Sequence, residues 1–72
     1  MTPSELHEEL LAAHVAGDGQ KMVELYTTAA NQTDDTDEEM FFLTHAFIFA
    51  LEAGHPTADE LRARLKAQGR ID

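Results

Sequence analysis

Apolar and polar residues recur along the chain with the three-to-four-residue spacing of amphipathic helices. Between residues 19 and 32, polar residues fall on one side of a helical wheel and apolar residues fall on the other, namely Met22, Val23, Leu25, Tyr26, Ala29 and Ala30. No segment alternates with the two-residue period of a strand. The pattern therefore predicts an all-α fold.

Capping residues mark where these helices begin and end. Thr and Asp side chains favour helix starts, and glycine favours helix ends. The predicted boundary residues are Thr2, Gly17, Asp18, Asp35 or Thr36, Gly54, Thr57 and Gly69. They give four helices, at about residues 3–16, 19–32, 37–53 and 57–68. Because the connections are short, we expect two antiparallel helical hairpins in a single domain over residues 1–72.

The third predicted helix is apolar around most of its circumference. No charged residue lies between Met40 and Leu51, and its only polar strip consists of Glu38, His45 and Glu52 at seven-residue spacing. A helix of this kind has to be enclosed. Either the other three helices cover it, or part of it stays exposed and forms an interface with a partner. The residues expected at that interface are Phe41, Phe42, His45, Ile48 and Phe49.

The length and composition limit the core that this chain can build. A chain of 72 residues buries only about 60% of the surface that its unfolded form exposes. This chain also has no cysteine, so it has neither a disulfide nor a thiolate metal site to support the fold. Association with a second chain is the remaining way to bury more apolar surface. We therefore expect a homo-oligomer, most simply a dimer, or a complex with another protein.

The charge of the chain suggests an alternative function. The net charge is −9, and residues 1–60 carry 13 acids against Lys21 alone. Such a charge disfavours nonspecific binding to nucleic acid or to an anionic membrane. It would suit an acidic regulatory protein that occupies a basic surface of another protein in place of nucleic acid, through Glu5, Glu8, Glu9 and the acids of residues 34–39.

The sequence also indicates a cellular compartment. Its first residues lack the basic segment and apolar run of a secretory signal, and no stretch approaches 18 consecutive apolar residues. The sequence accordingly predicts a cytoplasmic protein without a membrane partner.

No catalytic or metal-binding motif is complete. His7-Glu8-Glu9 begins like a helical zinc-protease motif, but Leu11 stands where the second histidine is needed. The acids of residues 34–39 lack the glycine and glutamate of an EF-hand, and they suit the positive end of a helix instead. We predict that the chain is not an enzyme and has no cofactor or metal site.

The four histidines, His7, His14, His45 and His55, are expected to hydrogen-bond locally or across helices. His7 and His14 are two turns apart, about 10 Å, which is too far for one ion to bridge. A metal site shared between two subunits is the alternative role for them.

The first hairpin resembles a tetratricopeptide repeat. Val15-Ala16-Gly17-Asp18 precedes Met22, Tyr26 and Ala29, where that family has a small residue, an aromatic residue and an alanine; Met22 replaces the small residue. Leu51-Glu52-Ala53-Gly54 repeats the pattern 37 residues after His14-Val15-Ala16-Gly17, close to the family's period of about 34.

The resemblance covers residues 6–68 and implies stacked hairpins that bind peptides or proteins on a concave face. Stable arrays usually need at least three repeats, so two hairpins would be either a fragment of such an array or half of a dimer that completes the stack. From these observations we predict a helical protein-interaction module that self-associates through the helix at residues 37–53.

Overall fold

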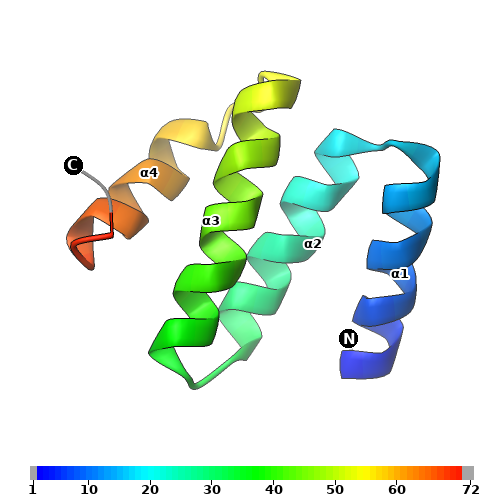
Figure 1. Cartoon of the computed structure of the whole chain (residues 1–72), viewed down its shortest axis with the longest axis horizontal. Coiled ribbons are helices and arrows are strands. Elements are labelled where there is room, and N and C mark those ends of the chain that lie inside the picture. Colours follow the sequence, from blue (N-terminus) through cyan, green and yellow to red (C-terminus); the bar gives the residue numbers. More distant parts are fainter. Residues whose placement is uncertain (1, 71–72) are drawn as a thin grey trace.

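The computed structural model describes residues 2–70, and within them the chain forms four helices (Figure 1). These are α1 (Pro3–Ala16), α2 (Gly19–Gln32), α3 (Thr36–Ala53) and α4 (Ala58–Ala67). No strand occurs over the same range. The predicted all-α class is confirmed, and each helix boundary lies within one residue of its predicted position.

The starts of α1 and α2 are fixed by side-chain caps, as predicted. Oγ1 of Thr2 accepts a hydrogen bond from the backbone N–H of Glu5 at 3.2 Å, and Oδ1 of Asp18 accepts one from the N–H of Lys21 at 3.0 Å. Each bond satisfies a backbone donor that has no partner inside its own helix. Gly17 ends α1 in the left-handed conformation, with φ at 68°, which lets the chain reverse at once into α2.

The two later helices begin differently from one another. Asp35, and not Thr36, caps α3, because its Oδ1 accepts from the N–H groups of Asp37 at 2.8 Å and Glu38 at 3.1 Å. Thr57 precedes α4 as predicted, but its side chain makes no capping hydrogen bond. Its hydroxyl instead lies 2.8 Å from Nδ1 of His55, which also accepts the Thr57 N–H at 3.2 Å.

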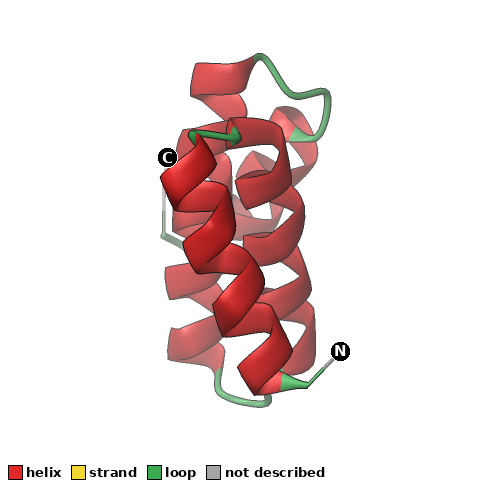
Figure 2. Ribbon diagram, turned by 90° about the vertical axis from the view of Figure 1, so that its right-hand side faces the viewer, coloured by secondary structure: helices red, strands yellow, loops and turns green. Residues whose placement is uncertain are grey.

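The four helices form a thin layer in chain order. Within residues 2–70, close backbone packing joins α1 with α2, α2 with α3, and α3 with α4. Helices that are not neighbours in the chain meet through side chains, as His14 of α1 and Phe49 of α3 do, with ring centroids 5.9 Å apart. The described chain measures 32 × 28 × 13 Å. Figure 1 looks down the shortest axis and shows the helices side by side, while Figure 2 shows the layer from its α1 edge. The predicted hairpins, α1 with α2 and α3 with α4, are therefore joined through the α2–α3 contact.

The core follows the layer as two clusters. The cluster between α2, α3 and α4 contains Val23, Ala30, Met40, Leu43, Ala46, Ala50, Leu61 and Leu65. The cluster between α1 and α2 contains Leu6, Ala13, Met22, Leu25 and Ala29. Tyr26, Phe42 and Phe49 are partly buried and pack against both clusters. Large side chains of α2 and α3 thus connect the two halves of the core.

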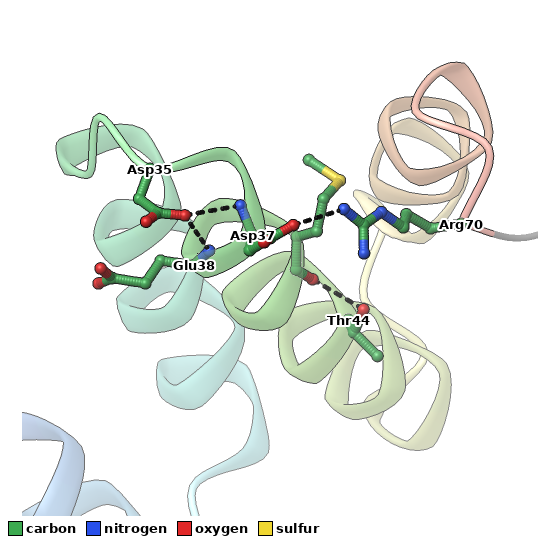
Figure 3. Close-up of polar contacts among 6 residues, drawn as sticks. Asp35, Asp37, Glu38, Thr44 and Arg70 are labelled. Carbon is green, nitrogen blue, oxygen red and sulfur yellow. Dashed lines mark hydrogen bonds and ion pairs between the residues drawn. The ribbon is translucent and has the colours of Figure 1, made fainter.

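Two arginines join the last part of the chain to the acidic start of α3. Arg64 donates to Glu39 at 3.3 Å and to Oδ1 of Asn31 at 3.0 Å, which links α4 to both α3 and α2. Arg70 donates to Oδ1 of Asp37 at 2.8 Å (Figure 3). Part of the negative charge of residues 34–39 is therefore paired within the chain.

Candidate interaction surface

The five residues predicted for an interface lie on two adjoining faces of α3. Phe41 and Ile48 are exposed, at 56% and 47% of their surface. Phe42 and Phe49 are partly buried and pack against both core clusters. His45 is half-buried. The structure thus separates two side chains that are open to a partner from two that hold the chain together.

A stripe of exposed side chains runs along α3 and extends beyond the predicted residues. Leu51 is not among those residues, yet it is the most exposed large apolar side chain of α3, at 60%. Phe41 and Ile48 are seven residues apart, and so are Thr44 and Leu51, which places all four on one helical face. We call these four residues the α3 stripe. The seven-residue spacing from Thr44 is the signal in the sequence that points to Leu51.

The stripe is exposed because the backbone of α3 packs closely only against α2 and α4, and His14 of α1 meets Phe49, which is not part of the stripe. Ala46 and Ala50, on the opposite side of α3 by helical spacing, are fully buried. Small side chains there let α2 approach closely, and a Cβ at Gly19 of α2 would lie 3.5 Å from Cβ of Ala53. With its small residues against α2, the helix turns its larger stripe residues to solvent.

Thr44 is the one polar member of the α3 stripe, and its hydroxyl is already satisfied. Its Oγ1 donates to the backbone carbonyl of Met40 at 2.8 Å, within the same helix (Figure 3). Burial of a polar group is costly when it loses its hydrogen-bond partner. Because this hydroxyl keeps its partner inside α3, the whole stripe is suited to an apolar interface.

A cluster of aromatic rings crosses from α1 over α2 to α3. Tyr26 is at its centre, stacked on Phe49 with ring centroids 5.8 Å apart and on His45 at 5.3 Å. On the other side, Nε2 of His14 lies 3.1 Å from the Tyr26 hydroxyl. Phe42 lies 6.4 Å from Tyr26 by ring centroids. These rings link three helices, so they contribute to the fold as well as to the surface.

The histidines use their ring nitrogens mainly for contacts within the chain. The expected bond across helices is confirmed for His14, whose partner Tyr26 lies on α2. Nδ1 of His45 donates to the backbone carbonyl of Phe41 at 2.9 Å, which is the expected local bond. Over residues 2–70, no group of three or more His, Cys, Asp or Glu side chains is placed to hold a metal ion.

A small apolar pocket lies at one end of the groove between α1 and α3. Its volume is about 300 Å³, and its lining residues are Leu6, His7, Leu10, Ala29, Gln32, Thr33 and Phe42. This volume is at the lower end of the range for ligand sites, about 300–1,000 Å³. The α3 stripe runs from residue 41 to residue 51 of an 18-residue helix, and none of its four residues lines this pocket.

No family model, no curated protein and no solved structure matches the chain. In the part of the chain that the structure describes, no helix is both long enough and apolar enough to cross a membrane. Because the comparisons found no match, a functional proposal has to be argued from the structure of this chain alone.

Proposed function

We propose that this chain is a helical protein-interaction module that self-associates as a dimer through the α3 stripe. The observation that carries the proposal is the alignment of Phe41, Ile48 and Leu51, each 47–60% exposed, on one face of one helix. Single exposed apolar side chains are common on protein surfaces, whereas contiguous apolar patches mark interaction sites. A second copy offers the same stripe and so covers it with apolar surface.

The energy available from burial is of the size that a weak dimer needs. Each of the three large stripe residues exposes on the order of 100 Å², which is worth about 2.5 kcal/mol at about 25 cal/mol per Å². Six such side chains in a dimer give about 15 kcal/mol. Association costs about 4–15 kcal/mol. A micromolar dimer, which requires about 8 kcal/mol net, lies within this balance.

The arrangement of the helices supports the further proposal that the chain is tetratricopeptide-like. Close backbone packing is confined to helices that are neighbours in the chain, which is the contact pattern of stacked repeats. Two hairpins are fewer than the three repeats that stable arrays usually need. A dimer that joins the α3–α4 hairpins of two copies would provide four hairpins in one assembly.

The acidic alternative, binding to a basic protein surface, has less support. Two of the acids that it would use, Asp37 and Glu39, already pair with Arg70 and Arg64. Engaging a basic partner through them would compete with these pairs. The α3 stripe needs no such exchange, because its large residues are open to solvent.

Sedimentation of the purified chain tests the proposal. We expect the wild-type chain to be a dimer at micromolar concentration and Ile48→Glu to be monomeric, because the substitution places a charge at the centre of the stripe. Ala63→Glu, at an exposed position on α4, adds the same charge outside the stripe and should remain dimeric. Circular dichroism should show equal helix content in all three proteins. A wild-type chain that stays monomeric throughout the micromolar range would reject the proposal.

A further inference from the structure

The spacing of the α3 stripe limits how two copies can pair. In a two-fold symmetric interface, if residue i of one copy contacts residue j of the second, then j of the first contacts i of the second. The stripe is symmetric about Ala46, with Phe41 and Leu51 five residues to either side and Thr44 and Ile48 two residues to either side. Antiparallel helices would therefore bring Phe41 against Leu51 twice, and Thr44 against Ile48 twice. Parallel helices would instead bring each residue against itself.

Charge decides between these two arrangements. The N-terminal end of α3 and the residues just before it carry five acids: Asp34, Asp35, Asp37, Glu38 and Glu39. Arg70 and Arg64 pair with two of these acids, so the cluster keeps an excess of three negative charges. Parallel helices would place two such clusters about 8–10 Å apart, within roughly one Debye length at physiological salt. Antiparallel helices separate them by about the length of α3, whose 18 residues span roughly 27 Å. Only the antiparallel arrangement avoids this repulsion.

The opposite end of α3 suits an acidic neighbour better. Glu52 is the one acid at this end of α3, and after it the chain has no charged residue until Asp59. An antiparallel pair therefore sets a single acid, and not a second acidic cluster, beside each N-terminal cluster. The helix macrodipoles also oppose one another in an antiparallel pair, so that the positive N-terminal end of each α3 lies beside the negative C-terminal end of the other. Both features favour the same arrangement as the separation of the acids.

We propose that two copies of this chain pair through antiparallel α3 helices, about a two-fold axis that crosses the exposed side of α3 at the level of Ala46. This inference rests on the proposed self-association and adds the orientation and the register of the two helices. Thr44 of each copy then faces Ile48 of the other. The Thr44 residues of the two copies do not face one another. They are displaced by four residues along the helix axis, about 6 Å, and are also separated by the distance between the two helices.

Single cysteines test the orientation directly, because the wild-type chain has none. We would prepare Thr44→Cys and Ile48→Cys separately, confirm by sedimentation that each remains a dimer, and oxidise each alone and then an equal mixture. A disulfide needs Cα atoms within about 7 Å. The antiparallel arrangement predicts a disulfide between the two variants in the mixture and several-fold less disulfide in either variant alone. Mass spectrometry distinguishes the mixed species.

A control cysteine outside the stripe and two contrary outcomes complete the test. Ala63→Cys, on the exposed face of α4, reports disulfides that form by random collision. Dimers in which each stripe variant forms disulfides with itself, and not preferentially with the other, would overturn the antiparallel arrangement while leaving self-association intact. A monomeric wild-type chain, with stripe cysteines no more reactive than the control, would remove both proposals.

Discussion

The hydroxyl oxygen of Tyr26 lies 3.1 Å from Nε2 of His14, and this contact joins the middle of α2 to the end of α1. Its position matters because the backbone of α1 packs closely only against α2, while its contact with α3 is made by side chains such as His14 on Phe49, with ring centroids 5.9 Å apart. The same tyrosine ring stacks on Phe49 of α3, with ring centroids 5.8 Å apart. Tyr26 therefore connects the first helix to the rest of the layer in two ways, through its hydroxyl and through its ring.

Removing these two connections separately should have unequal effects. We expect Tyr26→Phe to lower the free energy of unfolding by about 1 kcal/mol or less, because it loses one solvent-accessible hydrogen bond. Tyr26→Ala also loses the ring contacts and should cost about 2 kcal/mol or more. Urea unfolding followed by circular dichroism measures both values. Equal losses for the two variants would show that the ring contacts of Tyr26 contribute nothing to the stability of the domain.

Truncation of two leucines of α3 should affect two different properties: the stability of the monomer for Leu43 and the affinity of the dimer for Leu51. Leu43 is fully buried, so Leu43→Ala should cost about 2–5 kcal/mol, a large share of the stability of a small domain. Leu51 is 60% exposed, and Leu51→Ala should change the unfolding free energy of the dilute monomer by less than about 0.5 kcal/mol. In sedimentation, however, Leu51→Ala should weaken the dimer several-fold. A dimer unaffected by Leu51→Ala would place the interface elsewhere.

The helix boundaries could be predicted from the sequence because local chemistry sets them. Asp18 and Asp35 cap their helices with their own side chains, and Gly17 and Gly54 adopt positive φ. These interactions span only a few residues, so they do not depend on how the helices pack. Thr57 is the exception, since its hydroxyl contacts His55 instead of capping α4.

The exposed face of α3 could be predicted only in part. The absence of charge around most of the helix indicated a surplus of apolar surface, but the sequence did not show which side α2 and α4 would cover. Phe42 and Phe49 were expected at the same surface as Phe41 and Ile48, yet they pack against both core clusters. Which residues remain open depends on the position of α1 across the groove, a contact between segments far apart in the chain.

The cap of α3 should make a measurable contribution to stability. Oδ1 of Asp35 accepts two backbone hydrogen bonds, from Asp37 and Glu38. We expect Asp35→Ala to cost about 1 kcal/mol, which lowers the melting temperature by about 4–8 °C in a domain of this size. Asp34→Ala removes the same charge one residue earlier and should change stability by less than about 0.5 kcal/mol. If the two variants melted together, the loss would come from charge and not from capping.

Two glycines should respond with opposite signs to the same substitution. Gly54 has φ at 65°, so Gly54→Ala should destabilise by about 1–2 kcal/mol through backbone strain, although its surroundings are open. Gly19 lies in α2, and an added Cβ would meet only Cβ of Ala53, at an ordinary 3.5 Å. Gly19→Ala should therefore stabilise by about 0.4–1 kcal/mol, because it restricts the unfolded chain. Thermal unfolding of the two variants beside the wild type measures both signs.

The salt dependence of association should separate the apolar interface from the acidic alternative. Each copy carries a net charge of −9, so two copies repel one another, and this repulsion is weakest when salt screens it. Raising the ionic strength from about 10 mM to about 150 mM shortens the Debye length from about 30 Å to about 8 Å. We expect the dissociation constant of the dimer, measured by sedimentation equilibrium, to fall by several-fold over this range. Binding of an acidic surface to a basic partner would weaken instead, because the same screening removes its attraction. A dimer that dissociates as salt is added would have ionic contacts at its interface, and the α3 stripe would then not be what holds it together.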